Sequence, residues 1–125
     1  MKKSLLEIYS LAVCFITIIC FAVALGVGIY DVLEMTVPDF TLKSHAYEQH
    51  QTNEAFTRRW KEERRTKYTD DEITALRQES YDVSLSTERR DAFQSCIRVG
   101  IIVVIDLIIF LLHWMLAKRA RQENT

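Results

Sequence analysis

The stretch VGIIVVIDLIIFLLHWML, from Val99 to Leu116, is apolar except for Asp106 and His113. A second apolar run, IYSLAVCFITIICFAVALGVGIY, covers Ile8–Tyr30. Roughly 20 consecutive apolar residues match the hydrocarbon thickness of a bilayer when they form a helix. The sequence therefore predicts two transmembrane helices, at residues 8–30 and 99–116.

Asp106 is the least expected residue in these runs. A carboxylate near the bilayer centre costs about 2.5–3.5 kcal/mol, so it needs a partner or a function. In an antiparallel pair of spans, we expect Asp106 to lie level with residues 17–20, from Thr17 to Cys20, and His113 to lie near Cys14. Three states remain open: a protonated Asp106 bonded to Thr17, contact with a water-filled path, or a cation from another protein. Asp106, His113 and Thr17 are candidates for a proton or ion path, but a contact that fixes helix pairing is the preferred interpretation.

The section between the two runs, residues 31–98, is strongly charged. It holds fourteen acidic and eleven basic residues and no long apolar run, so it offers little for a globular core of its own. Gly and Pro are almost absent from it, which favours helices over strands. We expect an all-α membrane protein in which two antiparallel transmembrane helices are joined by a long extramembrane helical hairpin.

Flanking charges predict the orientation of this hairpin. Lys2 and Lys3 precede the first span, and a basic tail follows the second at residues 117–125. By the positive-inside rule, residues 1–7 and 117–125 are cytoplasmic and residues 31–98 are extracytoplasmic. A cleavable signal peptide is the alternative for the first span, because Ala22-Val23-Ala24 resembles a cleavage site. The length of the apolar run favours a retained anchor.

Two arms are expected in the hairpin. Ser44 is placed to cap a helix that continues to about Thr66, with His50, Phe56 and Trp60 in a weak apolar stripe. This first arm would place Arg58 and Arg59 four residues before Glu62 and Glu63, as exposed ion pairs.

The second arm has a clearer start. Thr69 and Glu72 form a capping box, and the helix they open has an inward face at Ile73, Leu76, Ser80 and Val83. This arm either continues into the second span or breaks within residues 84–87, where short hydroxyl side chains compete with helix.

Two pairs of small residues in the first span could let another helix approach closely. They are Ala22 with Gly26, and Ala24 with Gly28. Such spacing favours helix association in lipid but is common in membrane spans.

The sequence contains no recognisable catalytic or ligand-binding motif. We find no catalytic motif, no metal-ligand spacing and no phosphate loop, and therefore expect no enzyme, no metal and no cofactor. The basic residues around Trp60 are offset by Glu62 and Glu63, which argues against nucleic-acid binding. Cys96 lies just before the second span, where an intermolecular disulfide is one possibility and simple packing the preferred one.

Residues 71–95, DEITALRQESYDVSLSTERRDAFQS, followed by IIVVIDLIIFLLHW at 101–114, resemble small two-pass bacterial proteins of unknown function. The resemblance covers about half of the chain and implies a bacterial inner membrane, in which the extracytoplasmic hairpin would be periplasmic. It implies no activity and no catalytic residue.

These features lead to three functional hypotheses. The first is a non-enzymatic assembly or accessory protein of the membrane, whose hairpin and spans contact further copies of itself or a partner subunit. The second is a proton- or ion-handling subunit that uses Asp106. The third is a sensor input module that works through a partner, because the tail is too short to form an output domain.

Overall fold

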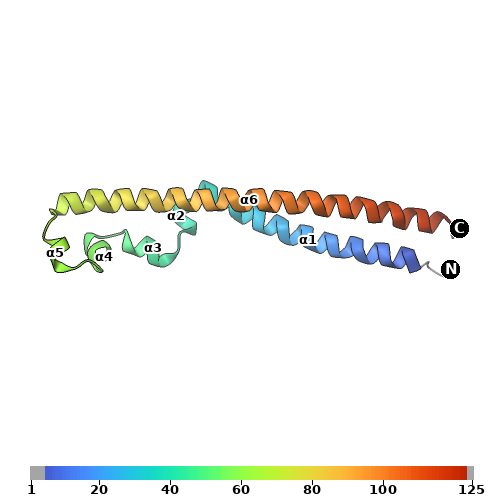
Figure 1. The fold of residues 1–125 in the computed structure, drawn as a ribbon, viewed down its shortest axis with the longest axis horizontal. Coiled ribbons are helices and arrows are strands. Elements are labelled where there is room, and N and C mark those ends of the chain that lie inside the picture. Colours follow the sequence, from blue (N-terminus) through green and yellow to red (C-terminus); the bar gives the residue numbers. More distant parts are fainter. Residues whose placement is uncertain (1–4, 124–125) are drawn as a thin grey trace. The chain divides into compact units, whose positions relative to one another are not determined.

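The computed structural model describes residues 5–123, which are all-helical, with no strand in that range. Two long helices, α1 (Leu5–Thr36) and α6 (Asp70–Glu123), enclose four short ones in the sequence (Figure 1). Both long helices are long and apolar enough to cross a membrane. Lys2 and Lys3, on which the predicted orientation partly depends, lie outside the described residues, as do the last two residues of the predicted tail.

The chain divides into two units. One comprises the residues up to Asp31 together with those from Gln94 onward, and the other is Val32–Phe93. The predicted spans belong to the first unit, and most of the predicted hairpin belongs to the second.

Helix α1 continues past the apolar run and ends at Thr36, immediately before the Val37-Pro38 step. The residue before a proline is pushed out of the helical region, and Val37 accordingly has φ −132° and ψ 63°. Pro38 then begins the short helix α2 (Pro38–Thr41), where its missing N–H costs nothing. Residues 31–43 are therefore largely helical, with a break at Val37.

The first predicted arm, a single helix from Ser44 to about Thr66, is wrong. This segment forms three short helices: α3 (Ser44–Gln49), α4 (Asn53–Thr57) and α5 (Glu62–Arg65). Thr52 and Lys61 precede the second and third of them with extended backbone.

The first break, between α3 and α4, is explained by a contact with α6. Arg77 of α6 donates from Nη1 to the carbonyls of His50 (2.9 Å) and Gln51 (2.6 Å), and so satisfies groups at the end of α3 that a continuing helix would have used. Thr52 then caps α4 by accepting a hydrogen bond from the amide of Ala55 at 3.1 Å.

The second break separates Arg58 and Arg59 from Glu62 and Glu63, so the exposed pairs expected on one helix do not share one. Arg59 instead lies 3.1 Å from the Nε2 atom of His45.

Aromatic rings hold the second unit together. The ring of His50 lies 5.8 Å from Phe56 and 5.6 Å from Tyr81, measured between centroids. Phe56 contacts Trp60 at 5.5 Å, and Trp60 contacts Tyr68 at 5.7 Å. The residues of the predicted stripe thus pack as expected, although they come from separate helices.

The phenol of Tyr81 is affected by its position in this unit. Burial raises the pKa of Tyr81 above its ordinary value, and the nearby charge of Asp39 raises it further. The neutral phenol is therefore the form that the folded unit favours.

The predicted start of α6 is confirmed. The amide of Thr69 donates to the carboxylate of Glu72 at 2.8 Å, and the amide of Glu72 donates to the hydroxyl of Thr69 at 3.3 Å. Of the two alternatives for the second arm, the structure has the continuous helix. The hydroxyls of Ser84 and Thr87 bond to carbonyls one turn earlier instead of breaking the helix.

One member of the predicted inward face of α6 is wrong. Ile73 is buried, with 4% of its surface exposed, but Val83 is 58% exposed. Ser84 is partly buried in its place because it lies four residues after Ser80 and so follows that side of the helix.

Candidate functional site

The buried residues of α1 recur at intervals of three, four or seven residues. Its buried positions are small or polar, although the helix around them is almost entirely apolar: Glu7, Ser10, Cys14, Thr17, Ala24 and Asp31. Residues at this spacing lie along one face of a helix. We call this face, together with the matching face of α6, the seam.

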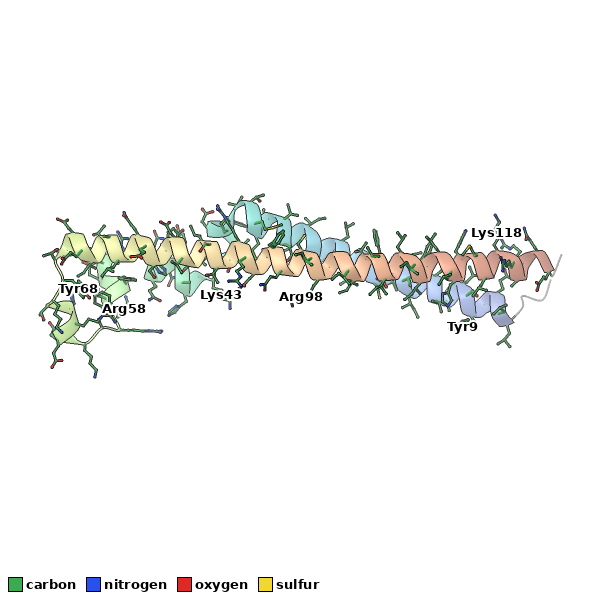
Figure 2. The ribbon with its side chains drawn as sticks, turned by 45° about the horizontal axis from the view of Figure 1, so that its top comes forward. Tyr9, Lys43, Arg58, Tyr68, Arg98 and Lys118 are labelled. Carbon is green, nitrogen blue, oxygen red and sulfur yellow. The ribbon has the colours of Figure 1, made fainter. Side chains whose placement is uncertain are left out.

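Helix α6 carries the same repeat within the first unit. Its less exposed positions include Val99, Val103, Asp106, Phe110, His113, Ala117 and Ala120. The residues between them are mostly large, apolar and exposed, as Ile105, Leu107 and Leu112 illustrate. Figure 2 draws the side chains as sticks and labels Tyr9 near the start of α1 and Lys118 near the end of α6.

Contacts between the two faces define their register. Glu7 pairs with Arg121, with 3.6 Å between Oε1 and Nε, and the ring of Tyr9 lies 5.9 Å from that of His113. Further along α1, the thiol of Cys14 is directed at the carbonyl of Phe110, at 3.8 Å. Partner numbers in α6 therefore fall as numbers in α1 rise.

The small-residue pairs of α1 differ in their surroundings. Ala24 is buried, and a Cβ placed on Gly28 would lie 3.6 Å from Cγ1 of Val99, so these two residues form part of the seam. Ala22 is exposed, and a Cβ on Gly26 would have no neighbour within 4 Å. Only one of the two pairs therefore packs against α6.

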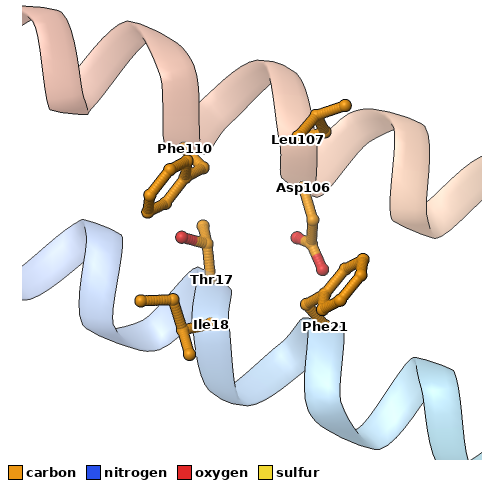
Figure 3. A pocket seen from close by; sticks show the side chains of 6 residues that line it. All are labelled: Thr17, Ile18, Phe21, Asp106, Leu107 and Phe110. Carbon is orange, nitrogen blue, oxygen red and sulfur yellow. The ribbon is translucent and has the colours of Figure 1, made fainter.

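Asp106 lies in the wall of a cavity of about 190 Å³ in the seam. The other lining residues are apolar apart from Thr17: Ile18, Phe21, Leu107 and Phe110. Figure 3 shows the carboxyl group of Asp106 directed toward α1 beside Phe21, and the side chain of Thr17 near Phe110. The predicted level of Asp106 along α1 agrees with this placement.

The hydrogen bond considered between Asp106 and Thr17 is not formed. Thr17 donates its hydroxyl proton to the carbonyl of Cys14 at 2.8 Å, within its own helix. A threonine has one such proton, so its hydroxyl cannot donate to the carboxyl group, and its oxygen is left as an acceptor for a protonated Asp106. The Oδ2 atom of Asp106 is buried and has no hydrogen-bond partner among the described residues. Leaving such an atom unpaired costs about 1–3 kcal/mol, and more when the group is charged.

His113 lies on the same face as Asp106 but has its own partners. Its Nδ1 atom is 2.9 Å from the carbonyl of Ile109, so this nitrogen carries a proton, and its ring packs against Tyr9. The expected neighbour, Cys14, is opposed by the Phe110 backbone instead.

Three buried polar residues of α1 were missed by sequence analysis. They are Glu7 (6% exposed), Ser10 (0%) and Asp31 (3%). Oγ of Ser10 and Oδ2 of Asp31 have no hydrogen-bond partner in the described part of the chain. The signal that could have found them is their regular spacing with Cys14, Thr17 and Ala24.

Polar groups are unevenly distributed along the seam. Glu7, Ser10, Thr17, Asp106 and His113 all lie between the Asp106 cavity and the Glu7–Arg121 pair. Between the cavity and Asp31, the seam is formed by Ala24, Gly28, Val99 and Val103. The seam therefore carries most of its polar side chains between the cavity and Glu7, and is apolar from the cavity as far as Asp31.

The cysteines are free in this structure, with Cys14 buried, Cys20 exposed and Cys96 partly buried. Residues 5–123 contain no group of three or more His, Cys, Asp or Glu side chains that could hold a metal ion. Comparison with protein-family models, curated proteins and solved structures found no match to this chain.

The two glycines of α1 provide a matched test of the seam. We expect Gly28→Leu to lower the free energy of unfolding by about 1–3 kcal/mol, because the new side chain meets Val99 across the seam. The leucine of Gly26→Leu would extend into open space, so this substitution should change the free energy of unfolding by less than about 0.5 kcal/mol. Unfolding in mixed detergent micelles measures both. Equal effects at the two positions would contradict the assigned seam.

Proposed function

We propose that this chain is a two-pass membrane protein in which α1 and α6 cross the bilayer as an antiparallel pair. Support comes from the large apolar side chains that surround both helices and remain exposed, since few residues of the apolar segments are buried within the chain. In water such surfaces would drive aggregation, whereas in a bilayer they face lipid. The register of contacts along the seam supports the antiparallel direction.

In the proposed topology both termini are cytoplasmic in a bacterial inner membrane, and the loop between the spans is periplasmic. Lys118, Arg119 and Arg121 follow the second apolar run and support this orientation, because basic residues concentrate on the cytoplasmic side. The pair formed by Glu7 and Arg121 would then lie at the cytoplasmic end of the two spans.

Within this membrane setting, the chain acts as a non-enzymatic assembly or accessory subunit. The observation that carries this proposal is the buried, unpartnered oxygen of Asp106 in a cavity of the seam. A polar atom at that depth gains most from a hydrogen-bond donor, and a neighbouring membrane helix is one source of such a donor. The second unit supports the same role, because Phe56 and Ile73 are its two large buried apolar side chains among the described residues. So small a core benefits from a partner.

Cross-linking in native membranes tests this role. We expect a lysine- or thiol-reactive reagent to capture either a defined homo-oligomer or a complex with one discrete partner. Asp106→Asn should reduce the yield of that complex severalfold, whereas Ile105→Ala, on an exposed face of the same helix, should leave it unchanged. A chain that stays monomeric under all conditions would refute the assembly role.

A second candidate, proton or ion handling, is favoured by the polar half of the seam. Glu7, His113 and Asp106 are titratable groups placed along it, and such groups inside membrane proteins commonly mark proton or ion paths. The packed apolar half separates Asp106 from Asp31, so a path through one chain would reach Asp106 from the side of the termini.

Flux through proteoliposomes separates the two candidates. If the chain handles protons or cations, Asp106→Asn should abolish pH- or potential-driven flux while the helical content stays constant. Flux that is absent from the wild-type protein, or that persists in the variant, would eliminate this second candidate.

A further inference from the structure

We propose that the cavity beside Asp106 receives the ammonium group of a lysine from a partner transmembrane helix. This inference rests on the proposed role as an assembly subunit and specifies the chemistry of the contact. Three features of the site support it: the groups that line the cavity, the lack of a cation in the chain's own spans, and the open face on which the cavity lies.

The lining of the cavity suits an organic cation. The Asp106 carboxyl group can accept hydrogen bonds from an ammonium group, and its Oδ2 atom has no partner among the described residues. Thr17 donates its hydroxyl proton to the Cys14 carbonyl, but its oxygen can still accept a hydrogen bond. Phe21 and Phe110 line the same cavity, and aromatic faces attract cations. Ile18 and Leu107 offer apolar contact to the four-carbon stem of a lysine.

The cation cannot come from this chain's own spans. Residues 5–36 and 99–117 contain no lysine or arginine. His113 is the sole basic side chain in those two segments, and it is engaged by the Ile109 carbonyl and the Tyr9 ring. A second copy of the chain would bring the same composition, so charge complementarity favours a different protein.

The cavity is accessible from the outer face of the helix pair. Ile18, Phe21 and Leu107, which line it, also belong to the exposed apolar surface. Ala22 follows Ile18 by one turn of α1, and Gly26 follows Ala22 by another, with open space at its Cβ position. A partner helix can therefore approach the backbone of α1 closely next to the cavity.

Model transmembrane peptides test the chemistry without knowledge of the natural partner. The full chain is reconstituted into phosphatidylcholine vesicles with a labelled Leu/Ala-rich transmembrane peptide that has lysine at its centre. The matched peptide has leucine at the same position. We expect the lysine peptide to bind wild-type protein about tenfold more tightly in a fluorescence energy transfer titration.

Substitutions at Asp106 then assign this preference to the cavity. Asp106→Asn should remove it, Asp106→Glu should retain most of it, and Ile105→Ala should leave it intact. Circular dichroism of each variant confirms that the helices still form. Asp106→Lys should reverse the preference in favour of a peptide with a central aspartate, which a general loss of folding cannot produce.

Three results would overturn the proposal: equal binding of the two peptides to wild-type protein, a lysine preference that survives Asp106→Asn, or displacement of the lysine peptide by unlabelled Asp106→Asn copies of the chain, which have no lysine site of their own. The last result would identify a second copy as the occupant. If the peptides fail but native cross-linking still captures a discrete partner, the lysine contact alone is refuted and the assembly role stands.

Discussion

The close contact between α1 and α6 is the interaction on which the first unit depends. In lipid, two helices gain little from burying apolar side chains against each other, because lipid tails are equally apolar. What favours pairing is backbone proximity and polar contact, and the seam provides both. Gly28 and Ala24 allow approach at one end, and the Glu7–Arg121 pair lies at the other. Asp106 lies between them, and its buried Oδ2 atom has no hydrogen-bond partner in the described part of the chain.

The seam has one part suited to close helix packing and another that carries polar groups. The half formed by Ala24, Gly28, Val99 and Val103 has no polar side chain and suits tight packing. The half that leads from Glu7 to Asp106 carries hydroxyl, imidazole and carboxyl groups within an otherwise apolar helix pair. Substitutions in different parts of the same interface therefore test helix packing and the proposed function separately.

Much of the local structure was predictable because it depends on neighbours in sequence. The capping box of Thr69 and Glu72 and the continuous helix after it follow from nearby residues. The level of Asp106 relative to Thr17 follows from pairing two apolar runs of similar length in opposite directions. In each case the deciding residues lie close in sequence or are related by a simple repeat.

The failures share a different cause. The first arm breaks because Arg77, far along the chain, takes the carbonyls of His50 and Gln51, and no local pattern reveals that contact. Thr17 bonds to its own helix instead of Asp106 because the Cys14 carbonyl is always within reach. The burial of Asp31 was missed because it follows the apolar run and resembles an ordinary flanking charge.

Disulfide formation in membranes tests the central claim, the antiparallel seam, most directly. A chain with Cys14, Cys20 and Cys96 replaced by alanine would carry Gly28→Cys with Val99→Cys, or Gly26→Cys with Val99→Cys as the control. The account predicts rapid intramolecular oxidation of the first pair, because a Cβ at residue 28 lies 3.6 Å from the Val99 side chain, and slow oxidation of the second. Equal rates for the two pairs, or cross-links only between separate chains, would contradict it.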